Sequence, residues 1–182
     1  NKWWNEEEDF PEEIGYAKMA SLYKKGDPGA QENYRPISLL NAFYKIIAAV
    51  LQKQIAELVD EEIQKTQYGF RKNRSTAQAI HIIRRIQEFV ERGKVKSNII
   101  LLDWEKAFDR VDQEMLIRCL EWHGLPRKHI DLIKLLYKSP YFSVDIEGKK
   151  SDYKKQRTGI RQGCPLSPYL FILTMDTIFF HI

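Results

Sequence analysis

Apolar residues recur three and four positions apart in the first half of the chain. The sequence from 42 to 59, AFYKIIAAVLQKQIAELV, has this spacing and predicts an amphipathic helix that begins after an N-cap at Asn41. AQAIHIIRRIQEFVER repeats the pattern, with Ser75 or Thr76 as its cap and Gly93 closing it. Three more helices are predicted: from Asp112 to Gly124, from Pro126 to about Lys138, and from an N-cap at Ser167 and a first residue at Pro168 onward.

Other stretches have the shorter period or the turn residues of strands and loops. SNIILLD, residues 97–103, is continuously apolar before its aspartate and predicts a strand buried on both faces. YFSVDI and YKKQRT alternate around the turn EGKK, which predicts a β-hairpin. KKGDPGAQENYRP and GIRQGCPLSP are typical of loops, and TQYGFRKNR of a loop or short strand. The order of these elements indicates an α+β fold. No GxGxxG or GxxxxGK[ST] motif occurs, which argues against a standard nucleotide-binding α/β fold.

Length and composition set wide limits. With 182 residues, 43% of them hydrophobic, the chain can bury a core as one domain or two small lobes. No run of about 18 apolar residues occurs, so no membrane partner is expected. The two cysteines, Cys119 and Cys164, lack metal-ligand spacing, which favours a reducing, intracellular setting, and no signal-peptide pattern opens the chain. The final segment is still apolar and helical at Ile182, which predicts a piece of a longer protein.

Charge is unevenly distributed, although the net charge is only +4. Residues 65–96 contain nine Lys and Arg against two Glu, and residues 149–161 contain six against one Asp. Residues 5–13 contain six acidic side chains and no basic one. Basic stretches are either solvated surface or the footprint of a polyanion, and two of them around one acidic motif favour nucleic acid.

That acidic motif is LLDWEKAFDRVD, residues 101–112, in which Asp103 closes the predicted strand. A carboxylate held at the end of a strand suits a hard cation such as Mg²⁺ or Mn²⁺, which prefers oxygen ligands. Capping of the following turn is the alternative, because aspartate commonly serves there.

Four motifs occur in a fixed order: LYKKGDPGAQENYRPISLLNAFYKI, QYGFRKNRST, LLDWEKAFDRVD and GIRQGCPLSPYLF. Together they resemble the polymerase region of reverse transcriptases, most closely those of non-LTR (LINE-type) retrotransposons, with group II intron enzymes as nearest relatives. The resemblance extends from about Leu22 to Phe171. It implies a right-hand polymerase fold, with an N-terminal extension and fingers over residues 1–96 and an incomplete palm over 97–182. It also implies an RNA-directed DNA polymerase with an RNA template, a DNA primer, an RNA–DNA hybrid and dNTP as partners, nuclear or cytoplasmic in a eukaryote.

The resemblance implies roles for particular residues. Asp103 matches the first catalytic, metal-binding aspartate of the palm, and the backbone carbonyl of Trp104 would be a second ligand. Phe108 matches the aromatic gate beneath the nucleotide sugar, with core packing as the alternative. Gln162 and Gly163 match residues that line the nucleotide pocket.

The basic residues are carried over in the same way. Arg71 and Arg74 are candidates to hold the triphosphate or the template backbone, and the sequence does not decide how they share this with Lys72. Arg161 would contact a phosphate or be solvated. The residues implied to contact nucleic acid are Lys24, Lys25, Lys72, Arg161 and Pro165. Asp109 and Asp112 are expected to serve the turn and the helix cap, and Glu105 to face solvent.

One family motif is missing from the sequence. The hairpin with paired aspartates that should follow the GIRQGCPLSP helix does not occur, so two metal ions are expected only in a longer parent protein. The 182-residue chain alone is therefore expected to be inactive. The alternative function is a catalytically incomplete RNA-binding module, or one that self-associates as a homodimer through an open palm edge.

Overall fold

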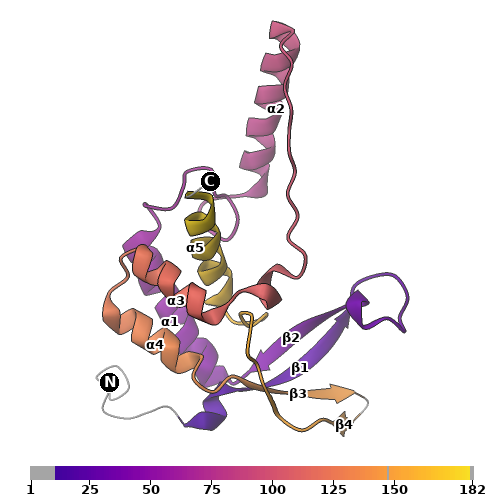
Figure 1. Cartoon of the computed structure of the whole chain (residues 1–182), viewed down its shortest axis with the longest axis vertical. Coiled ribbons are helices and arrows are strands. Elements are labelled where there is room, and N and C mark those ends of the chain that lie inside the picture. Colours follow the sequence, from indigo (N-terminus) through magenta and orange to yellow (C-terminus); the bar gives the residue numbers. More distant parts are fainter. Residues whose placement is uncertain (1–10, 147, 181–182) are drawn as a thin grey trace.

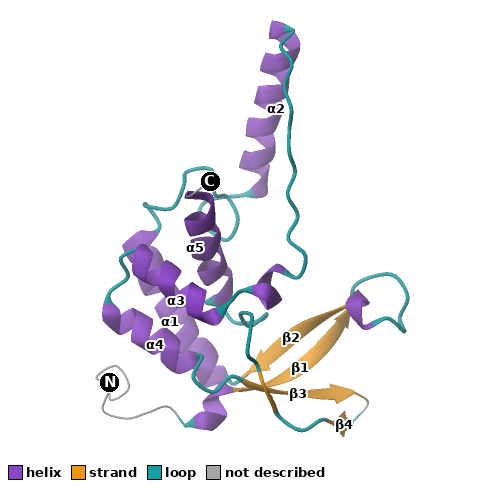
Figure 2. Cartoon of the chain, in the orientation of Figure 1, coloured by secondary structure: helices purple, strands orange, loops and turns teal. Residues whose placement is uncertain are grey.

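The computed structural model describes residues 11–146 and 148–180 and contains one mixed sheet beside a group of helices (Figures 1 and 2). The sheet has the order β2-β1-β3-β4, with β5 also paired to β3. β1 and β2 form an antiparallel hairpin, β3 lies parallel to β1, and β4 and β5 are antiparallel to β3. The strands are β1 (Tyr16–Tyr23), β2 (Tyr34–Leu40), β3 (Tyr141–Ile146), β4 (Lys149–Lys150) and β5 (Lys154–Lys155).

Five α-helices and three short 3-10 helices complete the described part. Four of the α-helices pack together beside the sheet, whereas α2 projects away from them (Figure 1). The α-helices are α1 (Ala42–Val59), α2 (Thr76–Gly93), α3 (Gln113–Trp122), α4 (Arg127–Leu136) and α5 (Ser167–Phe180). The 3-10 helices are η1 (Glu12–Gly15), η2 (Gln31–Asn33) and η3 (Ala107–Arg110). The predicted α+β class is confirmed.

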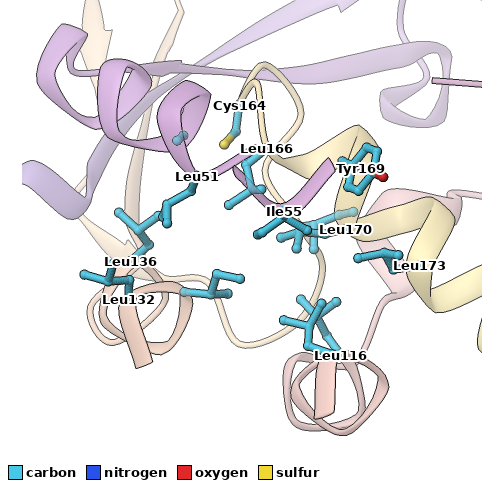
Figure 3. Close-up of a cluster of buried hydrophobic side chains, with 14 of the residues drawn as sticks. Leu51, Ile55, Leu116, Leu132, Leu136, Cys164, Leu166, Tyr169, Leu170 and Leu173 are labelled. Carbon is cyan, nitrogen blue, oxygen red and sulfur yellow. The ribbon is translucent and has the colours of Figure 1, made fainter. Parts of the chain in front are cut away.

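The core lies where α1, α3, α4 and α5 meet. α1 contributes Leu51 and Ile55, α3 contributes Leu116, and α5 contributes Leu170 and Leu173, which converge in the close-up (Figure 3). α5 buries side chains on most of its surface, which explains why its sequence is almost uniformly apolar. The loop before α5 adds Cys164 and Leu166 to the same cluster.

The caps predicted from sequence fix the starts of three helices. The Asn41 carboxamide accepts a hydrogen bond from the Phe43 amide at 2.8 Å. Ser75, rather than Thr76, forms a capping box with Gln78. Asp112 accepts from the amides of the second and third residues of α3, at 2.9 and 2.8 Å. Each of these bonds supplies a partner that a first-turn amide would otherwise lack.

The other helix boundaries differ from the prediction by a residue or two. The left-handed residue that ends α2 is Lys94, with φ of 50°, rather than Gly93. Pro126 is the N-cap of α4, whereas Ser167 is already the first residue of α5.

The predicted hairpin forms between β3 and its return strand. At Ser151 the return strand leaves the regular pairing: the Val144 amide donates to the Ser151 hydroxyl, at 2.9 Å, in place of its backbone carbonyl.

The predicted strand over residues 97–103 is wrong. These residues form no strand, and the exposed fractions of Ile100 and Leu101 are 82% and 85%. The segment runs back beside α2 without joining the sheet (Figure 1). An apolar run shows a preference for burial, but a strand also needs a neighbour for its backbone groups. Within the described residues, that neighbour is absent.

The sequence also hides two strands that the structure contains. β1 and β2 lie in the first forty residues, where only the loop at 24–36 was predicted, and β2 begins inside that loop. β1 reads YAKMASLY, and its alanines, lysine and serine weaken the strand signal. The predicted division at residue 96 stays a prediction, and β1 and β3 pair across it.

Candidate nucleotide and nucleic-acid site

The loop at residues 159–163 is docked against η3. The Gly159 amide donates to the Val111 carbonyl at 2.7 Å, and the Ile160 amide donates to the Phe108 carbonyl at 2.8 Å. Gly159 has φ of +82°, and a Cβ there would lie 2.8 Å from the Asp109 carbonyl oxygen. Only glycine permits this backbone angle and this approach together. The loop is therefore held closely against η3 by its backbone.

The far side of the same loop contacts β2. The Ser38 amide donates to the Gln162 carbonyl at 2.7 Å. Gly163 has φ of +102°, and a Cβ there would come within 2.8 Å of the Ser38 carbonyl oxygen. The side chain of Gln162 reaches back toward η3, where its Nε2 donates to Asp109 Oδ1 at 3.0 Å. The structure thus brings Gln162, Gly163 and η3 together, although the loop and η3 lie some fifty residues apart in sequence.

Phe108 is half-buried on η3. Its ring lies 5.0 Å from that of Phe171 on α5, and 6.2 Å from that of the exposed Phe70. One side of Phe108 therefore packs on the core while part of the ring remains accessible. Both interpretations made from the sequence, core packing and a nucleotide gate, stay compatible with this position.

Asp103 and Trp104 lie in the extended segment before η3. Both are exposed, so the expectation of a carboxylate fixed at the end of a buried strand is wrong. Within residues 11–146 and 148–180, no group of three or more His, Cys, Asp or Glu is placed to hold a metal ion. Mg²⁺ is usually held by one or two carboxylates, and waters and substrate phosphates complete its octahedral shell. The described residues alone do not form a metal centre, and the metal role of Asp103 stays a prediction.

Arg71 is buried, contrary to the phosphate contact predicted for it. Its guanidinium forms a two-bond ion pair with Asp60, Nε to Oδ1 at 3.1 Å and Nη2 to Oδ2 at 2.9 Å. It also donates to the backbone carbonyls of Asp60, Ile63 and Gln64. Because these partners occupy its donors, we assign Arg71 a structural role: it ties the loop after α1 to the end of that helix.

The same contacts alter two pKa values. Partial burial disfavours the Asp60 carboxylate, but hydrogen bonds from Arg71 and Tyr169 and the charges of Arg71 and Arg74 outweigh it, so the pKa of Asp60 is lowered. Burial, together with the charge of Asp60, raises the pKa of the Tyr169 hydroxyl. That hydroxyl donates to Asp60 Oδ1 at 3.0 Å.

Arg161 is the second correction, because its side chain is 1% exposed. Its Nη2 donates to the Gly15 carbonyl, and its guanidinium lies 5.2 Å from the centre of the Tyr44 ring. The side chain is buried, so the solvated arginine that the sequence allowed is excluded. Its aliphatic stem and cation–π contact make burial possible.

The remaining basic candidates stay near the surface. Lys72, Lys24 and Lys25 are exposed, the last two in the loop between β1 and β2. Arg74 is half-buried, with Nη1 donating to the Lys65 carbonyl at 3.4 Å and its guanidinium 5.8 Å from the Tyr68 ring. Pro165, on the loop before α5, is also exposed in the structure. Their contacts with nucleic acid stay predictions.

From the sequence, Asp109 was expected only to stabilise the turn, and its hydrogen bond with Gln162 was not predicted. The rings of Phe70 and Phe171 beside Phe108 were not predicted either. The only signal in the sequence was that Asp109 lies next to Phe108, a predicted site residue. Such proximity does not show where a side chain points. Asp112 and Glu105 behave as predicted, since Asp112 caps α3 and Glu105 is exposed, in an ion pair with Arg110 at 2.7 Å.

The described helices include none with the length and apolar character needed to cross a lipid bilayer. Exposed stretches rich in lysine and arginine are the electrostatic footprint expected of proteins that bind nucleic acid. The family model described as "Reverse transcriptase (RNA-dependent DNA polymerase)" matches residues 23–182. The chain therefore belongs to the reverse transcriptase family.

Several curated relatives agree with this assignment. The chain is 32% identical over 168 residues to the "Transposon TX1 uncharacterized 149 kDa protein" of Xenopus laevis, covering 92% of this chain and 13% of that protein. It is 31% identical over 172 residues to the "RNA-directed DNA polymerase from mobile element jockey" of Drosophila funebris, covering 92% and 19%. For the "Probable RNA-directed DNA polymerase from transposon BS" of Drosophila melanogaster, the identity is 28% over 173 residues, covering 92% and 19%.

The resemblance to non-LTR retrotransposon reverse transcriptases is confirmed by these matches. The chain spans less than a fifth of the length of each of these three relatives.

Proposed function

We propose that this chain is the fingers and part of the palm of a longer RNA-directed DNA polymerase encoded by a retroelement. The family match over residues 23–182 carries the proposal. The hydrogen bond from the Gln162 side chain to η3, which holds Phe108, supports it, as does the packing of Gly163 against β2. RNA template, DNA primer and dNTP are the proposed partners. A nuclear or cytoplasmic location is proposed from the retroelement relatives alone.

Extension of a DNA primer on an RNA template by the longer protein tests this function. We expect extension by the longer protein and none by the 182-residue chain, because the chain holds one of the carboxylates that a two-ion centre requires. Reverse transcriptases generally use divalent metal ions, and we propose Mg²⁺, with Mn²⁺ as a substitute, bound in part by Asp103 and the Trp104 carbonyl. A longer protein that binds RNA but never extends a primer would favour the RNA-binding alternative.

RNA binding by the chain should depend steeply on salt. Lys149, Lys150, Lys154 and Lys155 are all exposed, and β5 pairs through its backbone, so its side chains are free to meet phosphates. Each phosphate contact releases counterions, so the double variant Lys154→Gln/Lys155→Gln should reduce the log–log salt slope by about 2. Fluorescence anisotropy with a labelled RNA at several salt concentrations measures this slope.

Lys53→Gln is the matched control for that titration. Lys53 is exposed on α1, outside both basic stretches, where it lies 3.9 Å from Glu57. It should leave the slope unchanged. Equal slopes for the unaltered chain and the double variant would remove the hairpin from the binding surface.

Loss of the Phe108 ring should relax sugar selection in the longer protein. If the accessible part of the ring occupies the space of a 2′-hydroxyl, Phe108→Ala should raise ribonucleotide incorporation relative to dNTP by about tenfold or more, since one steric contact is worth about 1–3 kcal/mol. Single-nucleotide incorporation with paired rNTP and dNTP measures the ratio. Phe142→Leu, a half-buried ring on β3, is the control for general loss of packing. Unchanged selectivity in Phe108→Ala would leave only the core role.

A second candidate is self-association, which the exposed run Ile99–Leu102 favours. An extended apolar segment with unpaired backbone groups can pair with an identical segment of another copy. Light scattering over a range of concentrations should then show a mass that rises toward the dimer, and Leu101→Lys should lower it. A constant monomer mass would eliminate the homodimer.

A further inference from the structure

The side-chain amide of Gln162 is held by a carboxylate. Its Nε2 donates to Asp109 Oδ1 at 3.0 Å, and both side chains are half-buried. The backbone around Gln162 is already held in place. The Ile160 amide donates to the Phe108 carbonyl of η3, and the Gln162 carbonyl accepts from the Ser38 amide. What remains free is the rotation of the side chain, and Asp109 is the group that restrains it.

A carboxylate also decides which end of the amide faces it. The two ends of a glutamine amide have nearly the same shape, but one donates and the other accepts. An ionised carboxylate only accepts, so it selects the Nε2 end. The opposite orientation would bring two acceptor oxygens together in a half-buried space and lose the hydrogen bond. The carbonyl oxygen Oε1 is consequently turned away from Asp109, where it can accept a hydrogen bond from a ligand.

We infer that Asp109 is a positioning residue that fixes the polarity of Gln162, so that Oε1 is presented to a donor group, a hydroxyl or an amino group, of the bound nucleotide. This inference rests on the proposed function, because it takes Gln162 as part of the nucleotide pocket. Asp109 follows Phe108 directly on η3. The short helix therefore carries the candidate gate and the group that orients the pocket glutamine, and the two keep a fixed relation to each other.

The contact itself is tested in the 182-residue chain, without any activity. In ¹⁵N-labelled protein, the side-chain amide signals of Gln162 are identified by their loss in Gln162→Ala. In Asp109→Ala these signals should move toward those of a solvent-exposed glutamine, with faster exchange of the bonded proton. Asp112→Asn is the matched control, because Asp112 caps α3 three residues away and asparagine caps equally well. Signals that are the same in Asp109→Ala and in the unaltered chain would overturn the inference.

The orientation is tested by Asp109→Asn in the longer protein. Asparagine keeps the size of aspartate but can offer an amino group, so it also tolerates the reversed Gln162 amide. We expect KM for dNTP to rise by about tenfold while kcat changes by less than about threefold, the range of one hydrogen bond to a charged group. Thermal unfolding of the variant should match that of the unaltered protein.

The double variant Asp109→Asn/Gln162→Ala should be no worse than Gln162→Ala alone, because Asp109 acts through Gln162. If the double variant instead showed the product of the two single-variant effects on dNTP use, Asp109 would act independently of Gln162 and the positioning role would be overturned. A longer protein that extends no primer would count against the proposed function, and the amide signals of the 182-residue chain would then still decide the contact.

Discussion

Asp103→Asn in the longer protein should abolish most RNA-templated primer extension, by about a hundredfold or more, while leaving its stability unchanged. The loss is expected because asparagine keeps the shape of the side chain but lacks the charge that attracts a metal ion, and electrostatic stabilisation is usually the largest catalytic contribution. Stability should be unaffected because Asp103 is exposed and, in the described part of the chain, its side chain makes no hydrogen bond or ion pair. Primer extension and thermal unfolding of the same preparations measure the two quantities.

Glu105→Gln is the matched control for Asp103→Asn. Glu105 is an exposed carboxylate two residues away, paired with Arg110, and its loss should change extension by less than about twofold. If Asp103 served only the following turn, asparagine would replace it with little loss, since it serves at turns as readily as aspartate. Equal primer extension by Asp103→Asn and the unaltered protein would therefore show that Asp103 serves only the turn.

Arg71→Ala should destabilise the 182-residue chain by about 2–3 kcal/mol, the range for breaking a buried ion pair reduced for the partial exposure of Asp60. The variant leaves Asp60 without its two-bond partner and removes the donor for three backbone carbonyls. Urea unfolding measures the change. Arg74→Ala, which loses one long hydrogen bond to a backbone carbonyl, should cost less than about 1 kcal/mol. Similar losses for the two variants would mean that the burial of Arg71 contributes little.

The ion pair also predicts how acid affects the chain. The pKa of Asp60 is lowered from 3.8, so its contribution to stability is complete above that pH. It is lost as the pH falls below 3.8 and through the lower pKa of the folded state. Asp60→Asn should therefore flatten the acid limb of the stability curve below about pH 4, and Arg71→Ala should flatten it too. An acid limb that both variants leave unchanged would contradict the assignment.

The helices could be predicted because their signals are local. Asn41 and Asp112 cap helices with atoms two or three residues away, so the sequence contains both partners. Whether residues 97–103 form a strand could not be predicted from the local sequence. A strand needs a neighbouring strand, and an apolar run does not show whether one is present. β1 was missed for a different reason: its partner β2 is close in sequence, but the alanines and lysine of YAKMASLY give a weak strand signal.

The site was predictable in composition but only partly in environment. Gln162 and Gly163 were found by motif, and the structure holds both against β2. Because Arg71 and Arg161 are charged and lie in family motifs, both were expected to contact phosphate. Arginine can also bury its stem and bond backbone carbonyls, and the choice depends on Asp60, Tyr44 and Gly15, which no local pattern connects to them.

The parallel pairing of β1 with β3 sets an order for folding during synthesis. Tyr16 pairs with Tyr141, so about 125 residues must be made between the two partners. At the usual elongation rates, that takes roughly 6–25 seconds. The β1–β2 hairpin can form during this interval, since its strands are close in sequence, but the β1 edge that receives β3 stays open until β3, which follows α4, has left the ribosome. A nascent chain stalled before residue 141 would therefore expose this edge, and chaperone binding or misassembly is most favoured in that interval.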